Sequence, residues 1–100
     1  MIEKVNKYTT NANDIFEHVI KEDAFELNHV VIEPGKFFPK HPTDADVSII
    51  IVRGELSITL GNQDKKHYYK GTVLSVEKGI DSILGNGSNE PLELFVIKRK

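Results

Sequence analysis

His41 is the residue of this chain whose type and setting are best suited to chemistry. It lies between Pro39 and Pro42, and these prolines favour extended geometry on its flanks. Because an imidazole titrates near neutral pH, His41 could bind a carboxylate or act as a general base. Asp44 and Asp46 follow closely and could orient the ring or share a metal ion with it. The alternative is a hydrogen-bonded turn histidine beside two solvated acids.

His29 lies on a predicted strand face with three apolar side chains, those of Phe25, Leu27 and Val31. A lone histidine on an apolar face is more often a core or rim residue than a ligand-binding group. If that face lines the interior of the fold, His29 would join His41 in one cavity. The remaining histidines, His18 and His67, lie in polar surroundings and are predicted to be surface residues.

Composition indicates a globular chain and excludes several classes of function. The 100 residues are 39% hydrophobic and 28% charged, which is enough apolar material for one ordinary core. A net charge of −2 without a basic stripe argues against nucleic-acid binding. No apolar run approaches the roughly 20 residues that cross a bilayer, and residues 1–4 lack a signal peptide's apolar core. The absence of cysteine excludes disulfides and thiolate sites and is compatible with the cytoplasmic location that we expect.

The hydrophobic pattern predicts an all-β chain. Short alternating or β-branched runs are separated by turns rich in Gly, Pro and Asn, with no βαβ alternation. We expect one domain over residues 1–100, with a barrel core at about 25–97 and an N-terminal arm or hairpin at 1–24. The predicted extended segments are 14–21, 25–32, 36–39, 47–52, 56–60, 67–69, 72–76, 80–84 and 92–97.

Two apolar segments bear on how the core is covered. Residues 14–21 fit a helical face behind an Asn13 or Asp14 cap, but they also fit a strand. We favour the strand, because the turn at 21–23 is followed at once by another strand. The run 47–52 is almost continuously apolar, so we predict that it is buried on both faces. Its outward side chains then need a cover, from the N-terminal hairpin or from a second subunit.

The glycine and turn spacing resembles the first motif of the cupin superfamily, commonly written G-x5-H-x-H-x3-4-E-x6-G. Gly35 is followed after five residues by His41, which stands at the family's first histidine position. Thr43 stands at the second histidine position, Val47 at the glutamate position and Gly54 at the closing glycine.

The second cupin motif, commonly G-x5-P-x-G-x2-H-x3-N, is matched in the same register. Gly71, Gly79 and Asn86 stand at its glycine and asparagine positions, whereas Glu77 replaces the proline and Ser82 the histidine. The resemblance covers roughly residues 25–97 without a gap between the motifs. It implies a single-domain jelly-roll β-barrel of short antiparallel strands, and cupins often form dimers.

The resemblance also allows the metal-ligand positions of the family to be compared with the residues of this chain. In metal-binding cupins, two histidines and a glutamate of the first motif and a histidine of the second hold one divalent ion. The corresponding residues here are His41, Thr43, Val47 and Ser82, of which only His41 is a good ligand. We therefore expect a barrel without a metal cofactor, in which His41 would be the metal ligand if an ion were bound.

The same register predicts which side chains face the barrel interior. If Val47 points inward, Ile49 and Ile51 do so too. This gives an aliphatic floor with polar motif residues near the mouth, which is the composition of a small-molecule pocket. The alternative is that side chains fill the interior of a small barrel. The candidate ligand-binding residues are His41, Thr43, Val47, Ile49, Ile51, Ser82, Tyr68 and His29.

Three functions are compatible with this sequence, because fold alone does not decide function. The leading hypothesis is a metal-free barrel, acting as a homodimer, that binds or senses a small organic molecule. A metal-dependent oxygenase or isomerase is the second, and a structural or accessory dimerisation protein is the third. The expected partners are a second copy of the chain and a small organic ligand, and neither nucleic acid nor a membrane.

Overall fold

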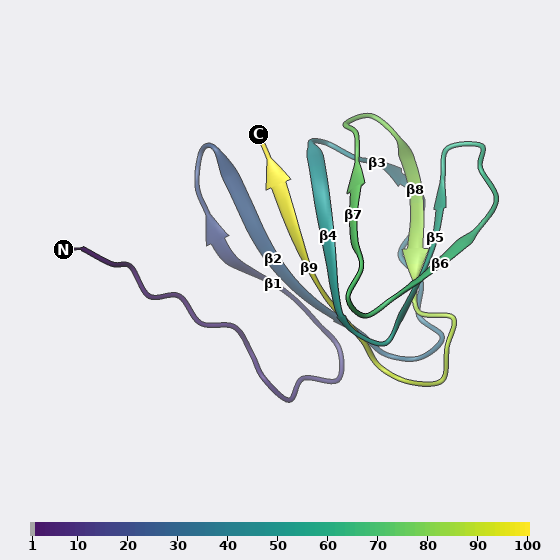
Figure 1. Cartoon of the computed structure of the whole chain (residues 1–100), viewed down its shortest axis with the longest axis horizontal. Coiled ribbons are helices and arrows are strands. Elements are labelled where there is room, and N and C mark those ends of the chain that lie inside the picture. The colour runs from purple at the N-terminus through teal and green to yellow at the C-terminus, as the bar shows by residue number, and fades with distance from the viewer. Residues whose placement is uncertain (1) are drawn as a thin grey trace.

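The computed structural model describes residues 2–100, and this part of the chain contains nine strands and no helix able to cross a membrane (Figure 1). Met1, the first residue of the predicted arm, lies outside the described residues. All strand pairs are antiparallel, which confirms the all-β prediction. The strands are β1 (Ile15–Lys21), β2 (Phe25–Ile32), β3 (His41–Pro42), β4 (Asp46–Arg53), β5 (Glu55–Leu60), β6 (Lys66–Tyr69), β7 (Val73–Val76), β8 (Asp81–Gly85) and β9 (Leu92–Arg99).

The strands form two sheets with the core between them. The larger sheet has the order β1-β2-β9-β4-β7, and the smaller has the order β3-β8-β5-β6 (Figure 1). Because side chains alternate along each strand, every second residue points between the sheets. The buried cluster unites both sheets and consists of Val30, Ile32, Ile49, Ile51, Leu56, Ile58, Leu92 and Leu94.

Residues 15–21 form strand β1, so the strand that the sequence favours over a helix is confirmed. β1 pairs along β2, and the turn between them closes with a hydrogen bond of 2.9 Å from Glu22 N to Phe25 O. The register puts Phe16 and His18 on the inner face of the larger sheet and Glu17 on its outer face.

Strand β4 is fully buried on one face only, so the prediction of burial on both faces is wrong for its outward side. Its inward side chains are buried as expected, whereas Ser48 and Ile50 are half-buried and Val52 is exposed. The reason is that the N-terminal hairpin pairs beside β9 as part of the same sheet and does not pack over β4.

Asn86, the last residue of the second motif, fixes the loop between β8 and β9. Its fully buried amide nitrogen donates to Ile32 O at 2.9 Å and to Glu90 O at 2.6 Å. Its Oδ1 accepts from Ser88 N at 3.0 Å and from Ser88 Oγ at 2.7 Å. These bonds tie the loop to the end of β2 and so determine where β9 enters the sheet.

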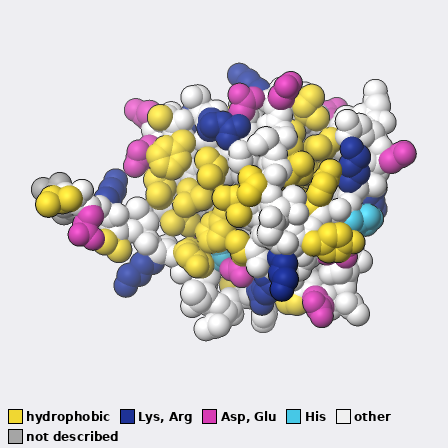
Figure 2. All heavy atoms as spheres, viewed as in Figure 1, with side chains coloured by type: hydrophobic (Ala, Val, Ile, Leu, Met, Phe, Trp, Pro, Cys, Tyr) yellow, Lys and Arg dark blue, Asp and Glu magenta, His cyan; other side chains and the backbone are white. Residues whose placement is uncertain are grey.

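The N-terminal arm, residues 2–14, runs along the larger sheet and extends past its edge (Figure 1). Tyr8 contacts the outer face, with its ring centroid 5.0 Å from that of Phe95, whereas Ile2 and Val5 are exposed. Figure 2 shows hydrophobic side chains gathered over β1, β2, β9 and β4. The outer face of the larger sheet is therefore an apolar surface that the arm covers in part.

Candidate functional site

The first and second motifs meet where β3 pairs with β8. In this register His41 stands directly opposite Ser82. The His41 side chain is exposed, and its Nδ1 lies 3.0 Å from Pro42 O. The strand pair fixes the backbone of both residues, so their side chains have defined positions at the rim of the space between the sheets.

Thr43 holds the turn of the second motif. Its hydroxyl donates to Glu77 O at 2.7 Å and accepts from Ile80 N at 3.2 Å. Its backbone N donates to Ile80 O at 3.0 Å, and its backbone O accepts from Gly79 N at 2.8 Å. Thr43 therefore gives this turn a defined shape although Glu77 replaces the motif's proline.

The two sheets leave a cavity of about 310 Å³ between them. This volume is at the lower end of the ~300–1,000 Å³ range of small-molecule sites. Its apolar lining comes from both sheets and the loop before β3 and comprises Phe16, Val30, Phe38, Val47, Ile49, Leu60, Val76, Leu84, Leu94 and Val96. The polar lining residues are Asn28, His41, Thr43, Asp44, Ser82 and Lys98.

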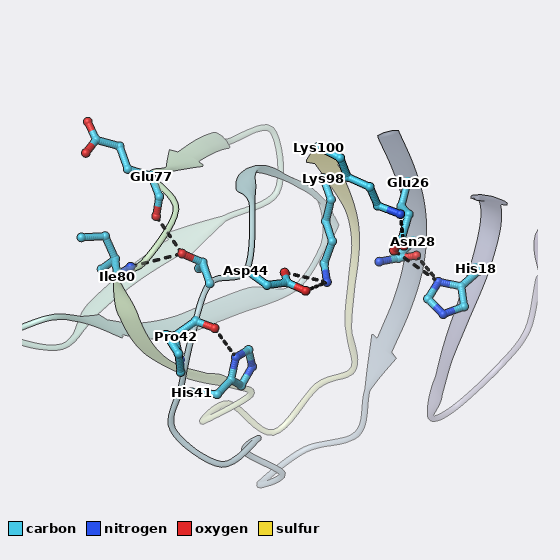
Figure 3. A network of polar contacts seen from close by, with 11 residues as sticks. His18, Glu26, Asn28, His41, Pro42, Asp44, Glu77, Ile80, Lys98 and Lys100 are labelled. Atoms are coloured by element: carbon cyan, nitrogen blue, oxygen red, sulfur yellow. Dashed lines mark hydrogen bonds and ion pairs between the residues drawn. The ribbon is translucent and has the colours of Figure 1, made fainter. Parts of the chain in front are cut away.

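Two ion pairs lie close to the cavity residues Asn28 and Lys98 (Figure 3). Lys98 Nζ lies 3.1 Å from Asp44 Oδ1, and Lys100 Nζ lies 2.6 Å from Glu26 Oε1. The hydrogen bond from Lys98 lowers the pKa of Asp44, and the hydrogen bond from Lys100 lowers the pKa of Glu26. Both carboxylates are therefore ionised at neutral pH, and each balances one lysine charge.

Five of the eight predicted site residues line the cavity, namely His41, Thr43, Val47, Ile49 and Ser82. Ile51 belongs instead to the buried core cluster, and Tyr68 packs against that cluster. Inward positions on a strand are about 7 Å apart, so the next inward residue after Ile49 already lies beyond the cavity wall.

His29 does not join His41 in the cavity, which corrects the expectation that both line one site. Its ring is buried on the outer face of the larger sheet, where Nδ1 lies 2.7 Å from Glu17 Oε2 and Nε2 lies 2.6 Å from Glu93 Oε2. The reason is the alternation of β2: its even-numbered residues face the core, so position 29 faces outward.

Asn28 and Lys98 are two cavity residues that neither motif indicates. Both line the cavity, because Asn28 shares the inner face of β2 with Val30 and Lys98 shares the inner face of β9 with Val96. The alternation of side chains along these two strands predicts that both residues face the cavity, once the core-facing side of each strand is known.

The donor set at the cupin metal position does not fit a divalent ion. Val47 offers no ligand atom, and the Thr43 hydroxyl is engaged by backbone groups. Asp46 accepts from Lys78 N at 2.8 Å, and Asp44 is paired with Lys98. Within residues 2–100, no group of three or more His, Cys, Asp or Glu side chains is arranged to hold a metal.

Two facing antiparallel sheets that enclose a lined cavity define the class of double-stranded β-helix barrels. The chain belongs to the cupin superfamily. It is 31% identical over 99 residues to "Uncharacterized protein MJ0764" of Methanocaldococcus jannaschii, covering 98% of this chain and 85% of that protein. The crystal structure of that RmlC-like cupin family protein matches with a TM-score of 0.94 over 99% of this chain and 92% of its own.

More distant structures share the fold. The cupin domain of Schizosaccharomyces pombe Cnp3 matches with a TM-score of 0.79 and 21% identity, over 90% of this chain and 65% of its own. The DMSP lyase DddQ of Ruegeria pomeroyi matches with a TM-score of 0.78 and 17% identity, over 88% of this chain and 47% of its own. No family model matches the chain.

Proposed function

We propose that this protein binds or senses a small, mainly apolar organic molecule in its barrel cavity, without a metal cofactor. The observation that carries the proposal is the cavity of about 310 Å³, with an apolar wall and polar side chains near its mouth. Burial of a ligand's apolar surface against such a wall is favourable by about 25 cal/mol per Å².

The polar lining residues supply orientation rather than metal chemistry. His41 and Ser82 face each other across the β3–β8 pair, and each can exchange a hydrogen bond with a ligand at the rim. Val47 and Thr43 at the metal-ligand positions support a metal-free mode of binding, because neither supplies an available donor.

Filling the cavity is expected to abolish binding of an apolar probe. In the Val47→Phe variant, the larger side chain occupies space beside Ile49 that the ligand would use. Toluene is a suitable probe. Its binding is measured in ¹H–¹⁵N NMR spectra as saturable shifts of the backbone amide signals of the strands that line the cavity. We expect saturable shifts in the wild type and none in Val47→Phe.

The matched control is Val73→Phe, the same substitution at an outward position. Val73 is 64% exposed and pairs with Ile50, and both side chains lie on the outer face of the larger sheet, away from the cavity. This variant should bind toluene as the wild type does. Equal loss of binding in both variants, or unchanged binding in Val47→Phe, would contradict a ligand site inside the barrel.

We further propose that the protein acts as a homodimer. Ile2 and Val5 are exposed on the arm, and the outer face of the larger sheet exposes Val52 and Val73. Residues 2–7 reach roughly 20 Å when extended, far enough to lie on the sheet of a second copy. The two apolar surfaces belong to the same chain, which favours a second copy as the partner.

Light scattering at micromolar concentration tests this assignment. We expect twice the chain mass of 11.3 kDa. A version lacking residues 1–7 should shift toward the monomer, because it loses the exposed apolar arm. A full-length protein that remains monomeric at this concentration would contradict the dimer.

A further inference from the structure

The Asn28 amide is a buried donor without a partner. Asn28 lies on the inner face of β2, is 1% exposed and lines the barrel cavity. Its Oδ1 lies 2.6 Å from His18 Nδ1. Its Nδ2 has no hydrogen-bond partner within the described part of the chain. Buried donors are almost always satisfied in proteins, so this amide nitrogen calls for an acceptor that enters the cavity.

The neighbours of Asn28 fix which way its amide points. His18 Nδ1 also lies 3.7 Å from Glu26 Oε2, and this carboxylate favours a proton on Nδ1. Nδ1 then donates to the Asn28 oxygen, which leaves the amide nitrogen on the other side. In Figure 3 the amide nitrogen points away from His18, to the side on which Lys98 and Asp44 lie.

Lys98 provides a second donor on the same wall. In the pairing of β2 with β9, Asn28 stands opposite Val96 and Lys98 stands one inward position further along. The Cα atoms of diagonal neighbours on one face are roughly 7–8 Å apart, so both side chains are within reach of one carboxylate between them. Lys98 is paired with Asp44, whose side chain is 76% exposed and can turn out into water.

We propose that the cavity ligand is a small carboxylate with an apolar body, whose oxygens accept hydrogen bonds from Asn28 Nδ2 and Lys98 Nζ. The apolar body then contacts Val30, Ile49 and Leu94. The ligand carboxylate takes the place of Asp44 as the partner of the Lys98 ammonium, while the Asp44 side chain turns out into water. This inference rests on the proposed function, because it names the ligand class of the same cavity.

The size of the cavity limits the acid. Its volume of about 310 Å³ corresponds to about ten water molecules at ~30 Å³ each. A single ring or a short branched chain with one carboxylate fits this volume. Benzoate, benzamide and toluene therefore form a matched set of probes: the ring is constant, and the group attached to it is a carboxylate, a neutral amide or a methyl group.

NMR titration with the three probes tests the proposal in the wild-type protein. We expect benzoate to bind about tenfold or more tightly than toluene, since hydrogen bonds to a charged group are worth at least that factor. The side-chain amide signals of Asn28 should shift with benzoate and stay in place with toluene. Benzamide should bind more weakly than benzoate, because it carries no charge for Lys98.

Three variants sharpen the test. Asn28→Leu and Lys98→Met should each lower the affinity for benzoate relative to that for toluene about tenfold or more. Asp44→Asn should strengthen benzoate, because it removes the carboxylate that competes for Lys98. If Asn28→Leu does not fold, the Asn28 signals of the wild type and the Lys98→Met variant still decide the result.

The outcomes separate this inference from the proposed function. If toluene binds and benzoate binds no more tightly, or the Asn28 signals do not respond to benzoate, the carboxylate assignment is overturned while the apolar cavity site stands. If benzamide binds as tightly as benzoate, the charge-specific role of Lys98 is overturned. If none of the three probes binds the wild type, the proposed function fails as well.

Discussion

Replacement of His29 by alanine is expected to lower the free energy of unfolding by about 3–5 kcal/mol. The side chain is 0% exposed, and its two ring nitrogens lie 2.7 Å from Glu17 Oε2 and 2.6 Å from Glu93 Oε2. Both ring nitrogens therefore lie within hydrogen-bond distance of a carboxylate oxygen, and the ring bridges the two glutamates. Alanine would leave two partly buried carboxylates without the side chain that bridges them. Urea unfolding followed by circular dichroism measures the loss.

His67→Ala is the matched control for this prediction. His67 also lies beside a glutamate, with Nδ1 3.2 Å from Glu55 Oε1, but its side chain is 47% exposed. Water screens an exposed pair of this kind, so the variant should change stability by no more than about 0.5 kcal/mol. An equal loss of stability in both variants would contradict the prediction that burial between two carboxylates makes His29 important for stability.

The pH dependence of stability gives a second measure of the same cluster. The backbone N–H of Thr9 and then the His29 ring lower the pKa of Glu17 from its ordinary value of 4.5. A lowered pKa means that the folded state favours the ionised form, so the contribution is present above pH 4.5 and is lost as the pH falls further. We expect His29→Ala to lose part of this dependence on acid, because one of the two groups that lower the Glu17 pKa is then absent.

The cluster also explains how the arm is held. Thr9 N and Thr9 Oγ1 donate to the Glu17 carboxylate at 2.8 and 2.9 Å. Tyr8 covers the His29 ring at a centroid distance of 4.8 Å, and Phe95 lies 4.9 Å from the same ring. His29→Ala should therefore loosen the arm, and faster cleavage by trypsin at Lys7 than in the wild type would report it.

Gly54→Ala is expected to lower the free energy of unfolding by about 3 kcal/mol. Gly54 connects β4 to β5 with a φ of +84°, a conformation that an L-residue adopts at a cost of about 1–2 kcal/mol. A Cβ at this position would overlap the Pro91 carbonyl oxygen and would lie 3.0 Å from Leu92 Cα. Both obstacles are backbone atoms, one just before β9 and one in its first residue, so relief requires movement of the strand, at a further cost of about 1–3 kcal/mol.

Gly79→Ala separates the two contributions. Gly79 has a φ of +85°, but a Cβ there would meet nothing within 4 Å. This variant should lose only the conformational term of about 1–2 kcal/mol. The difference between the two variants in urea unfolding isolates the contact of Gly54 with β9. If the two losses are equal, that close approach does not constrain the fold.

The strands and the barrel register could be predicted because their signals are local. Alternation over residues 56–60, the glycine turns and the gap-free motif spacing each depend on a few neighbouring residues. Strand β1 was harder to predict, because residues 14–21 fit both the helical and the strand periodicity. The tight turn that follows them favoured the strand. The inward direction of Val47 and Ile49 followed from the register alone.

The cavity could be predicted only in part. His41 and Ser82 stand at ligand positions of the two cupin motifs, so the resemblance implied one common site for them, and the structure pairs them. Asn28 and Lys98 belong to β2 and β9, which are adjacent in the sheet but distant along the chain. No local pattern reports that pairing, so their presence on one wall of the cavity was not foreseen.

The sequence by itself determined an antiparallel all-β chain, the cupin register and the loss of the metal-binding residues, because these depend on residue types at short spacings. The tertiary structure decided which face of each strand is the core. Alternation separates residues 28 and 29 of β2 onto opposite faces, but it does not say which face is inside. Packing against β4, β5 and β9 settles that choice, and it places Asn28 in the cavity and His29 between two glutamates on the outer face.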